Sequence, residues 1–155
     1  MAISWMNESE AYEFLAARVE GRLATCDATG NPYITPMNYL YHDGKIYFHC
    51  KSTGRKLDNI ASHSRVCFEV SQTVKSIFVE DPPCKCATRY DSVLAFGSAR
   101  VLRDAAEKAA VLNLLVARFA GGKPYQLVGE QRAAECAVVE ITIDEISGKR
   151  NIDPK

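Results

Sequence analysis

The feature that most constrains the fold of this chain is a series of short segments in which apolar residues alternate with polar ones, separated by turn-forming residues. His42-Asp43-Gly44-Lys45 is typical of a hairpin turn, and Gly97 predicts a bulge or a close approach of two strands. The strand–helix–strand alternation of a doubly wound fold is missing, as is a G-x-G-x-x-G motif. We therefore predict a mainly β fold with flanking helices, in which an antiparallel sheet closes into a barrel. The expected strands span residues 22–26, 33–41, 46–50, 65–70, 75–80, 92–102 and 137–143.

Three segments have helical spacing, and two of them begin with a capping residue. Asn7 predicts the cap of a first helix that ends before Gly21, and Asp104 predicts the cap of a third, where Glu107 completes a capping box. A second helix is expected from about Arg55 to Ser62. Its predicted buried residues are Leu57, Ile60 and Ala61. No repeat or linker divides the chain, so we treat residues 1–155 as one domain.

Composition and charge exclude several classes of protein. Hydrophobic residues make up 47% and charged residues 25% of the 155 residues, which is typical of globular domains. Basic and acidic residues number 19 each, so neither nucleic acid nor an acidic membrane surface is an expected partner. The N-terminus lacks the pattern of a signal peptide, and no apolar run approaches the roughly 18 residues that span a bilayer. We expect a cytoplasmic protein whose cysteines are reduced.

The segment from Phe48 to Lys56 is the strongest candidate for a ligand site. A strand is expected to end there, a small polar turn follows, and a helix begins with the adjacent cations Arg55 and Lys56. Free N–H groups at a helix start favour a phosphate, to which arginine adds a planar fork and lysine a point charge. Cations in a first turn oppose the helix dipole, and an anionic ligand would resolve that conflict. The alternative is a solvated helix whose first turn happens to be basic.

Pro36 lies inside the expected strand 33–41. Because proline cannot donate a ladder hydrogen bond, it indicates an edge strand or an interrupted ladder. Through the Asp43-Gly44 turn, this strand is expected to pair with residues 46–50 and so to lie beside the phosphate segment. Its free backbone groups would then be available to the edge of a planar heterocycle. The alternative is an ordinary edge strand that contains a proline.

Five segments follow one another in a specific order and spacing: Gly-Arg-Leu-Ala-Thr at 21–25, Asn-Pro-Tyr-Ile-Thr-Pro-Met-Asn-Tyr at 31–39, Gly-Lys-Ile-Tyr-Phe-His at 44–49, Gly-Arg-Lys-Leu-Asp-Asn-Ile at 54–60 and Val-Cys-Phe-Glu-Val at 66–70. Together they resemble the pyridoxamine 5'-phosphate oxidase-like flavoproteins, and within them the branch that contains the nitroimidazole-resistance proteins. Residues 90–97 and 146–150 also fit. The resemblance extends from about Gly21 to Arg150, which is nearly the whole chain.

The resemblance implies a six-stranded, Greek-key, antiparallel split barrel that works as a homodimer with FMN at the subunit interface. By position, Arg55 and Lys56 would hold the FMN phosphate, and residues 35–38 would run along the isoalloxazine ring. The implied cofactor contacts are Thr35, Pro36, Met37, Asn38, His49, Cys50, Lys51, Gly54, Arg55, Lys56, Ser92 and Lys149, with Arg150 as the alternative to Lys149.

His49 is the one candidate catalytic residue. In the nitroimidazole-resistance branch a histidine at the matching place is regarded as functional. An imidazole beside a flavin can donate a hydrogen bond or a proton near neutral pH. The alternative is a strand histidine that only shapes the pocket.

The leading hypothesis is an FMN-dependent oxidoreductase that reduces a small organic electrophile, such as a nitroaromatic, with electrons from NAD(P)H. The alternatives are a non-catalytic flavin-binding module and a heme-binding barrel. Vitamin B6 oxidation ranks last, because Thr35 stands where the true oxidase has an arginine and the oxidase's C-terminal substrate-binding arginines are not recognisable. Cys84-x-Cys86 has no partner pair of ligands, so no metal site is predicted.

Overall fold

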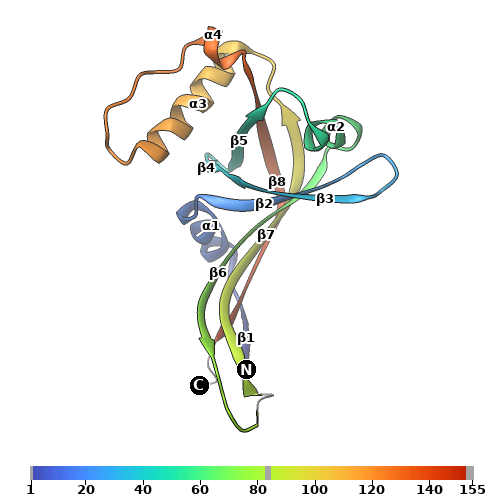
Figure 1. Ribbon diagram of the computed structural model, residues 1–155, viewed down its shortest axis with the longest axis vertical. Helices are drawn as coiled ribbons and strands as arrows, with labels where there is room; N and C mark the ends of the chain where they lie inside the picture. The colour runs from blue at the N-terminus through green and yellow to red at the C-terminus, as the bar shows by residue number, and fades with distance from the viewer. Residues whose placement is uncertain (1, 83–84, 153–155) are drawn as a thin grey trace.

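The computed structural model describes residues 2–82 and 85–152 and shows one antiparallel sheet flanked by helices (Figure 1). The mainly β fold with flanking helices is confirmed; the described residues form an eight-stranded sheet, where the resemblance implied six strands. The two additional strands are β1, which at four residues is too short to show a periodic pattern, and β4, whose first residues were expected as the end of the strand 33–41. The strands are β1 (Ala2–Trp5), β2 (Glu20–Cys26), β3 (Pro32–Asn38), β4 (Leu40–His42), β5 (Lys45–Lys51), β6 (Arg65–Ile77), β7 (Ala87–Val101) and β8 (Cys136–Ile152). The helices are α1 (Glu8–Ala17), α2 (Arg55–Ser62), α3 (Ala105–Ala120) and α4 (Glu130–Ala133).

The two edges of the sheet meet at Tyr39. The strand order is β3-β2-β6-β7-β8-β5-β4, with β1 paired to β8, so β3 and β4 are the edge strands although Tyr39 alone separates them in the chain. The Tyr39 side chain is fully buried; its hydroxyl donates to the Leu15 carbonyl, and its ring packs edge-on against Phe68 with 4.8 Å between centroids. The bend at Tyr39 therefore brings the two edges together without a ladder between them, which leaves the barrel split.

The expected pairing of residues 33–41 with residues 46–50 is wrong for most of its length. β3 pairs with β2, from Glu20 opposite Asn38 to Cys26 opposite Pro32, and only β4 pairs with β5. Inward-facing side chains keep their period of two through the bend at Tyr39, so the pattern contains no sign that the strand changes partner. Pro36 does lie on an edge strand, as predicted, because β3 pairs with no other described strand.

A long arm, which we define as the parts of β6, β7 and β8 that extend beyond the barrel, carries β1 at its far end (Figure 1). The expected strands 65–70 and 75–80 are one strand, and the strand expected over 137–143 continues to Ile152 as β8. Residues 71–76 are exposed, so ladder hydrogen bonds rather than apolar burial keep them in the sheet. The register shifts at Gly97, where a Cβ atom would lie 2.0 Å from the Thr142 carbonyl oxygen, which confirms the predicted bulge and close approach.

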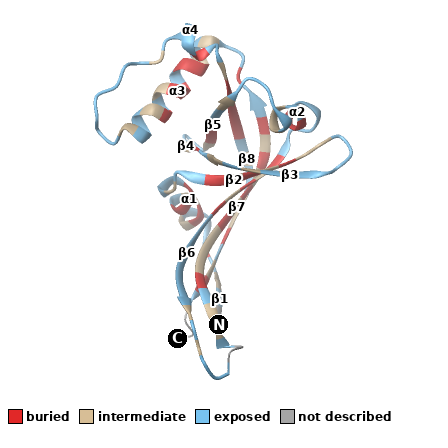
Figure 2. Ribbon diagram, viewed as in Figure 1, coloured by how far each residue is buried: buried red, intermediate tan, exposed pale blue. Residues whose placement is uncertain are grey.

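β5 separates two apolar cores, which Figure 2 shows as buried segments inside the barrel and beneath α3. Ile46 and Phe48 point into the barrel core, which also contains Tyr39 and Phe68. Tyr47 points the other way, into the core beneath α3. Since side chains alternate along a strand, His49 lies on the same face as Tyr47, toward α3 and outside the barrel.

A buried acidic residue connects α3 to the sheet. The Glu140 carboxylate is almost fully buried; it accepts hydrogen bonds from Arg100 Nε at 2.7 Å and Tyr47 Oη at 3.0 Å and lies 3.1 Å from Lys45 Nζ. Burial acts to raise the pKa of Glu140, but these donors outweigh it and hold the pKa below its usual value. Arg100 also binds Glu107 on α3 at 2.8 Å, so the position of α3 depends on this network.

The three predicted helices, α1, α2 and α3, begin where expected and differ in detail, whereas α4 was not predicted. α2 spans Arg55–Ser62 as expected, but its buried face includes Asn59 in place of Ala61, because Asn59 Nδ2 donates to Thr25 Oγ1 at 2.9 Å. α1 ends at Ala17, since β2 begins at Glu20. Glu107 does not complete a capping box, because its carboxylate binds Arg100. Within residues 2–82 and 85–152, no helix is both long and apolar enough to cross a bilayer.

Candidate functional site

The start of α2 carries the predicted phosphate ligands and is not capped by a side chain. Gly54 precedes the helix with φ 139°, a conformation that other residues rarely adopt, and open space surrounds the position of its missing Cβ atom. The first turn holds Arg55, Lys56 and Asp58. Among the described residues no side chain accepts from its first N–H groups, so the N–H groups of Arg55 and Lys56 and the positive end of the helix dipole are available to an anion.

Arg55 is held by the β2–β3 hairpin. Its guanidinium lies 4.8 Å from the centre of the Tyr33 ring and 3.8 Å from Asp27 Oδ2, while its side chain stays 53% exposed. Asp27 itself accepts from Thr29 Oγ1 at 2.7 Å and from the Asn31 backbone N–H at 3.0 Å. These hydrogen bonds, that of Thr29 first, lower the pKa of Asp27 to about 2. The aspartate therefore stays ionised and keeps Arg55 near the helix start without covering it.

Thr35 carries an unsatisfied buried hydroxyl on β3. Its Oγ1 atom is inaccessible to solvent and has no hydrogen-bond partner among the described residues. Tyr33, Thr35 and Met37 face inward along β3, whereas Pro36 and Asn38 face outward. A buried hydroxyl without a partner costs stability, and such orphans mark sites where a ligand or water completes the bonding.

The last residues of β5 lead toward the start of α2. Cys50 is half-buried and packs against the barrel core; burial raises the pKa of its thiol, an effect that the nearby Lys56 ammonium partly opposes. Cys50 is therefore a neutral thiol close to Lys56. Lys51 is exposed at the end of the strand.

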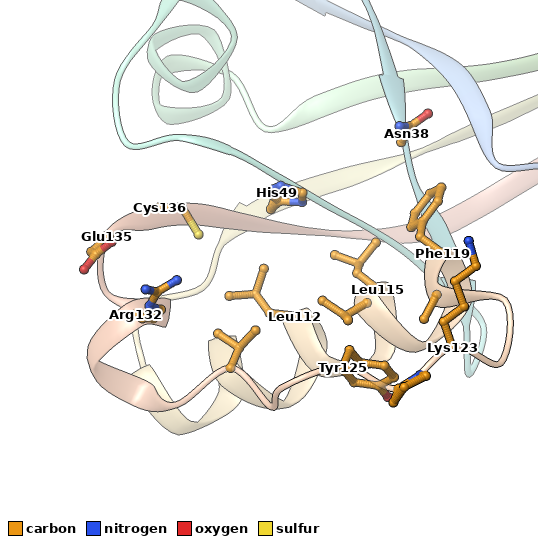
Figure 3. A pocket seen from close by; sticks show the side chains of 14 residues that line it. Asn38, His49, Leu112, Leu115, Phe119, Lys123, Tyr125, Arg132, Glu135 and Cys136 are labelled. Carbon is orange, nitrogen blue, oxygen red and sulfur yellow. The ribbon is translucent and has the colours of Figure 1, made fainter.

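A cavity of about 830 Å³ lies between α3 and the sheet (Figure 3). We call it the α3 cavity. It contains two of the predicted site residues, Asn38 from the end of β3 and His49 from β5. His49 is exposed, and its ring makes no hydrogen bond to the residues that the structure describes. The remaining lining residues are Leu112, Leu115, Val116, Phe119, Ala120, Lys123, Pro124, Tyr125, Val128, Arg132, Glu135 and Cys136.

Ser92 and Lys149 lie apart from the other predicted site residues. They face each other across β7 and β8 and line a cavity of about 350 Å³ over the arm, with Lys149 Nζ 5.8 Å from the centre of the Tyr90 ring. Arg150, the alternative to Lys149, lies 2.8 Å from Glu10 and 3.3 Å from Asp91. Within one chain, no described cavity contains both Ser92 and the α2 start.

Two groups of residues were not found from the sequence. Asp27 and Tyr33 hold Arg55, and neither residue was singled out from the sequence. Part of the apolar face of α3 forms the wall of the α3 cavity, which was not predicted from the sequence. The sequence does contain one signal for this cavity, the apolar residues Tyr125 and Leu127 in the segment after α3. In the structure they are 43% and 74% exposed.

The structure supplies no metal site among the residues that it describes, where no cluster of three His, Cys, Asp or Glu side chains is found. Cys86 is half-buried, and its sulfur accepts from the Val79 N–H at 3.2 Å. Cys84, the other member of the Cys-x-Cys pair, lies outside the described residues.

Comparison with known proteins gives one matching family and several similar structures. The family described as pyridoxamine 5'-phosphate oxidase matches residues 7–150. No curated protein sequence matches the chain. A candidate 5-nitroimidazole antibiotic resistance protein from Bacteroides thetaiotaomicron has a similar structure, with a TM-score of 0.80 and 20% identity over 97% of this chain and 89% of that one.

Two further similar structures are those of FAD-binding proteins. A FAD and heme binding protein from Mycobacterium smegmatis has a TM-score of 0.83 and 18% identity over 99% of this chain and 75% of that one. A FAD-binding protein from Mesorhizobium loti has a TM-score of 0.72 and 22% identity over 98% of this chain and 100% of that one. At these identities the structural similarity establishes the shared fold.

Proposed function

The chain belongs to the pyridoxamine 5'-phosphate oxidase family, and on this premise we propose that it binds FMN with the phosphate at the start of α2. The observation that carries the proposal is the uncapped first turn of α2, which combines free N–H donors, Arg55 and Lys56 beside the open space at Gly54. A phosphate there would satisfy the backbone donors and offset the repulsion between the two cations and the helix dipole.

The residues of β3 support a flavin that extends from this phosphate toward the α3 cavity. At about 3.3 Å per residue, the five steps from Tyr33 to Asn38 cover roughly 17 Å along the unpaired edge. Along this path lie the unsatisfied Thr35 hydroxyl and, at Pro36, a position that cannot donate a ladder hydrogen bond. We place the phosphate at the Arg55 end and the ring at the Asn38 end.

The chemistry that fits this arrangement is reduction of a small organic electrophile, such as a nitroaromatic. Bound FMN supplies two-electron transfer from a nicotinamide donor, and the protein supplies binding and orientation. His49 lies on the wall of the α3 cavity with both ring nitrogens available, where it can hold or deliver a proton to a bound substrate. Asn38, on the same wall, can orient that substrate through its amide.

We further propose that the working form is a homodimer with FMN at the interface. The support is the separation of Ser92 and Lys149 from the α2 start within one chain. A second copy would supply these two residues to the flavin held by the first. Sedimentation of the protein with and without FMN tests this, and a monomer with bound FMN would contradict it.

The decisive experiment compares FMN, FAD and riboflavin in absorption and fluorescence titrations of the purified protein. Because riboflavin lacks the phosphate, we expect it to bind about 100-fold more weakly than FMN. Equal affinities would contradict the phosphate site at α2, and no binding of any flavin would sink the proposed function. Turnover with NAD(P)H and a panel of nitro, quinone and ferric acceptors separates an enzyme from a non-catalytic flavin module.

Heme binding is the second candidate. It is favoured by the exposed His49 on the wall of a large apolar cavity and by the similarity to the FAD and heme binding protein of Mycobacterium smegmatis. Imidazole is a common axial ligand of heme iron. A Soret band that forms on heme addition and is lost in His49→Ala would support this function, and a spectrum identical to that of free heme would exclude it.

A further inference from the structure

The α3 cavity has an apolar wall and a cationic rim. Leu112, Leu115 and Phe119 of α3 form the wall, and Phe119 is 46% exposed although it is a large aromatic residue. The volume of about 830 Å³ is within the range of pockets that bind small organic molecules. An exposed aromatic side chain on the wall of such a pocket offers an apolar contact surface to a ligand.

The charges on the rim favour an anion. Lys123 and Arg132 both line the cavity, and neither forms an ion pair within the described part of the chain. Figure 3 shows the Arg132 side chain pointing toward the cavity, whereas the Glu135 carboxylate points outward. This local positive charge contrasts with the formal net charge of zero for the whole chain. It does not arise from a general basic field.

We infer that the α3 cavity binds an aromatic carboxylate, with the ring against the apolar wall of α3 and the carboxylate on Arg132. The planar fork of arginine fits a carboxylate, and Lys123 adds positive charge at the other end of the rim, beside Phe119 (Figure 3). This inference deepens the proposed function and rests on it, since it names the substrate class for the end of the site where His49 and Asn38 lie. A neutral aromatic would leave the charged groups of the rim without a partner.

The test is calorimetric titration with 2-naphthoate and its neutral counterpart 2-naphthamide, on protein with and without FMN. We expect naphthoate to bind about tenfold more tightly than naphthamide. Arg132→Gln should remove that preference while leaving the affinity for naphthamide unchanged. Lys75→Gln, which removes an exposed cation on β6 far from the cavity lining, should change neither affinity.

Phe119→Ala provides a second variant that does not depend on charge. It should weaken both ligands by a similar factor, about fivefold, because both lose the same aromatic contact. Equal affinity of the wild-type protein for the two probes, no binding of either probe, or an unchanged preference in Arg132→Gln would each overturn the inference. A cavity covered by a second copy of the chain would bind neither probe.

The flavin titration shows whether a negative result overturns only the aromatic carboxylate or also the proposed function. Protein that binds FMN but shows no preference for naphthoate overturns the aromatic carboxylate and leaves the proposed function standing. Protein that binds naphthoate through Arg132 but binds no flavin overturns the proposed function, and with it the role of the ligand as substrate.

Discussion

The first turns of α2 and α3 both carry backbone N–H groups without a partner inside the helix, but only α3 has a side-chain cap for them. Asp104 caps α3, since its side chain accepts from the Glu107 N–H at 2.8 Å, and Glu107 adds negative charge in the first turn. Gly54 stands at the equivalent position of α2, where no side chain accepts from the first turn and the helix begins with two cations. One helix satisfies its donors internally, and the other leaves them open.

This difference shows that the start of α2 is less stable than a capped helix start would be. A carboxylate cap at α2 would be worth about 1 kcal/mol, and cations in a first turn are unfavourable by roughly 0.3 to 1 kcal/mol each. At α3, nothing has to approach the helix start, so the cap serves stability alone. At α2, the same device would block an incoming phosphate. The comparison predicts that changes at α2 act on binding and changes at α3 act on stability.

The largest effect is expected for Arg55→Gln combined with Lys56→Gln. Loss of two charge-assisted contacts should weaken FMN binding about 100-fold and leave riboflavin binding unchanged. The stability of the flavin-free protein should change by no more than about 0.5 kcal/mol. Removing the unfavourable interaction of the two cations with the helix dipole offsets the loss of their exposed contacts. Flavin fluorescence titration and urea denaturation measure the two effects. Arg103→Gln, which removes an exposed cation just before the α3 cap, is the matched control and should affect neither.

A smaller effect on binding is expected for Thr35→Val. This substitution keeps the shape of the side chain and removes the buried hydroxyl that has no partner. Stability of the flavin-free protein should rise by about 1 kcal/mol, whereas FMN affinity should fall about five- to tenfold. Urea denaturation without flavin and titration with FMN give opposite signs if the hydroxyl serves the ligand. A drop in stability would show that the hydroxyl has a partner in the flavin-free protein.

Asp104→Ala tests the other side of the comparison. Loss of the cap should destabilise the protein by about 1 kcal/mol, read as a lower midpoint in urea. FMN affinity should stay the same, because α3 starts far along the chain from the phosphate site and its cap touches none of the proposed cofactor contacts. A cap variant that lost FMN binding at unchanged stability would reverse the roles assigned to the two helices.

The smallest effect concerns Asp27, which holds Arg55 at the start of α2. Its pKa is lowered from the unfolded value of 3.8 to about 2 in the folded protein. The stability that it contributes is therefore fully present above about pH 4 and is lost as the pH falls through about 2. Asp27→Asn should flatten the acid side of the stability curve between these two pH values, as measured by urea denaturation at several pH values. A curve parallel to that of the wild-type protein would contradict the hydrogen bonds to Thr29 and Asn31.

Local signals in the sequence predicted much of the fold. The caps of α1 and α3, the bounds of α2, the Asp43-Gly44 turn and the bulge at Gly97 all depend on neighbouring residues, so they could be identified from short patterns. The pairing of the strands could not be identified in this way. The chain changes partner at Tyr39 while the inward side chains keep the same period, and the exposed segment 71–76 is a strand because β7 continues beside it.

The candidate site likewise has parts that short sequence patterns predicted and parts that they did not. The cations after Gly54 and the proline on the edge strand are properties of single segments, and the sequence was sufficient to single them out. Tertiary structure alone decided that β3 borders β2, that Asp27 and Tyr33 hold Arg55, and that Arg132 comes to the same cavity as His49. The physical reason is distance along the chain: helix caps, turns and side-chain periodicity depend on residues a few positions apart, whereas strand pairing and cavities depend on segments that are far apart.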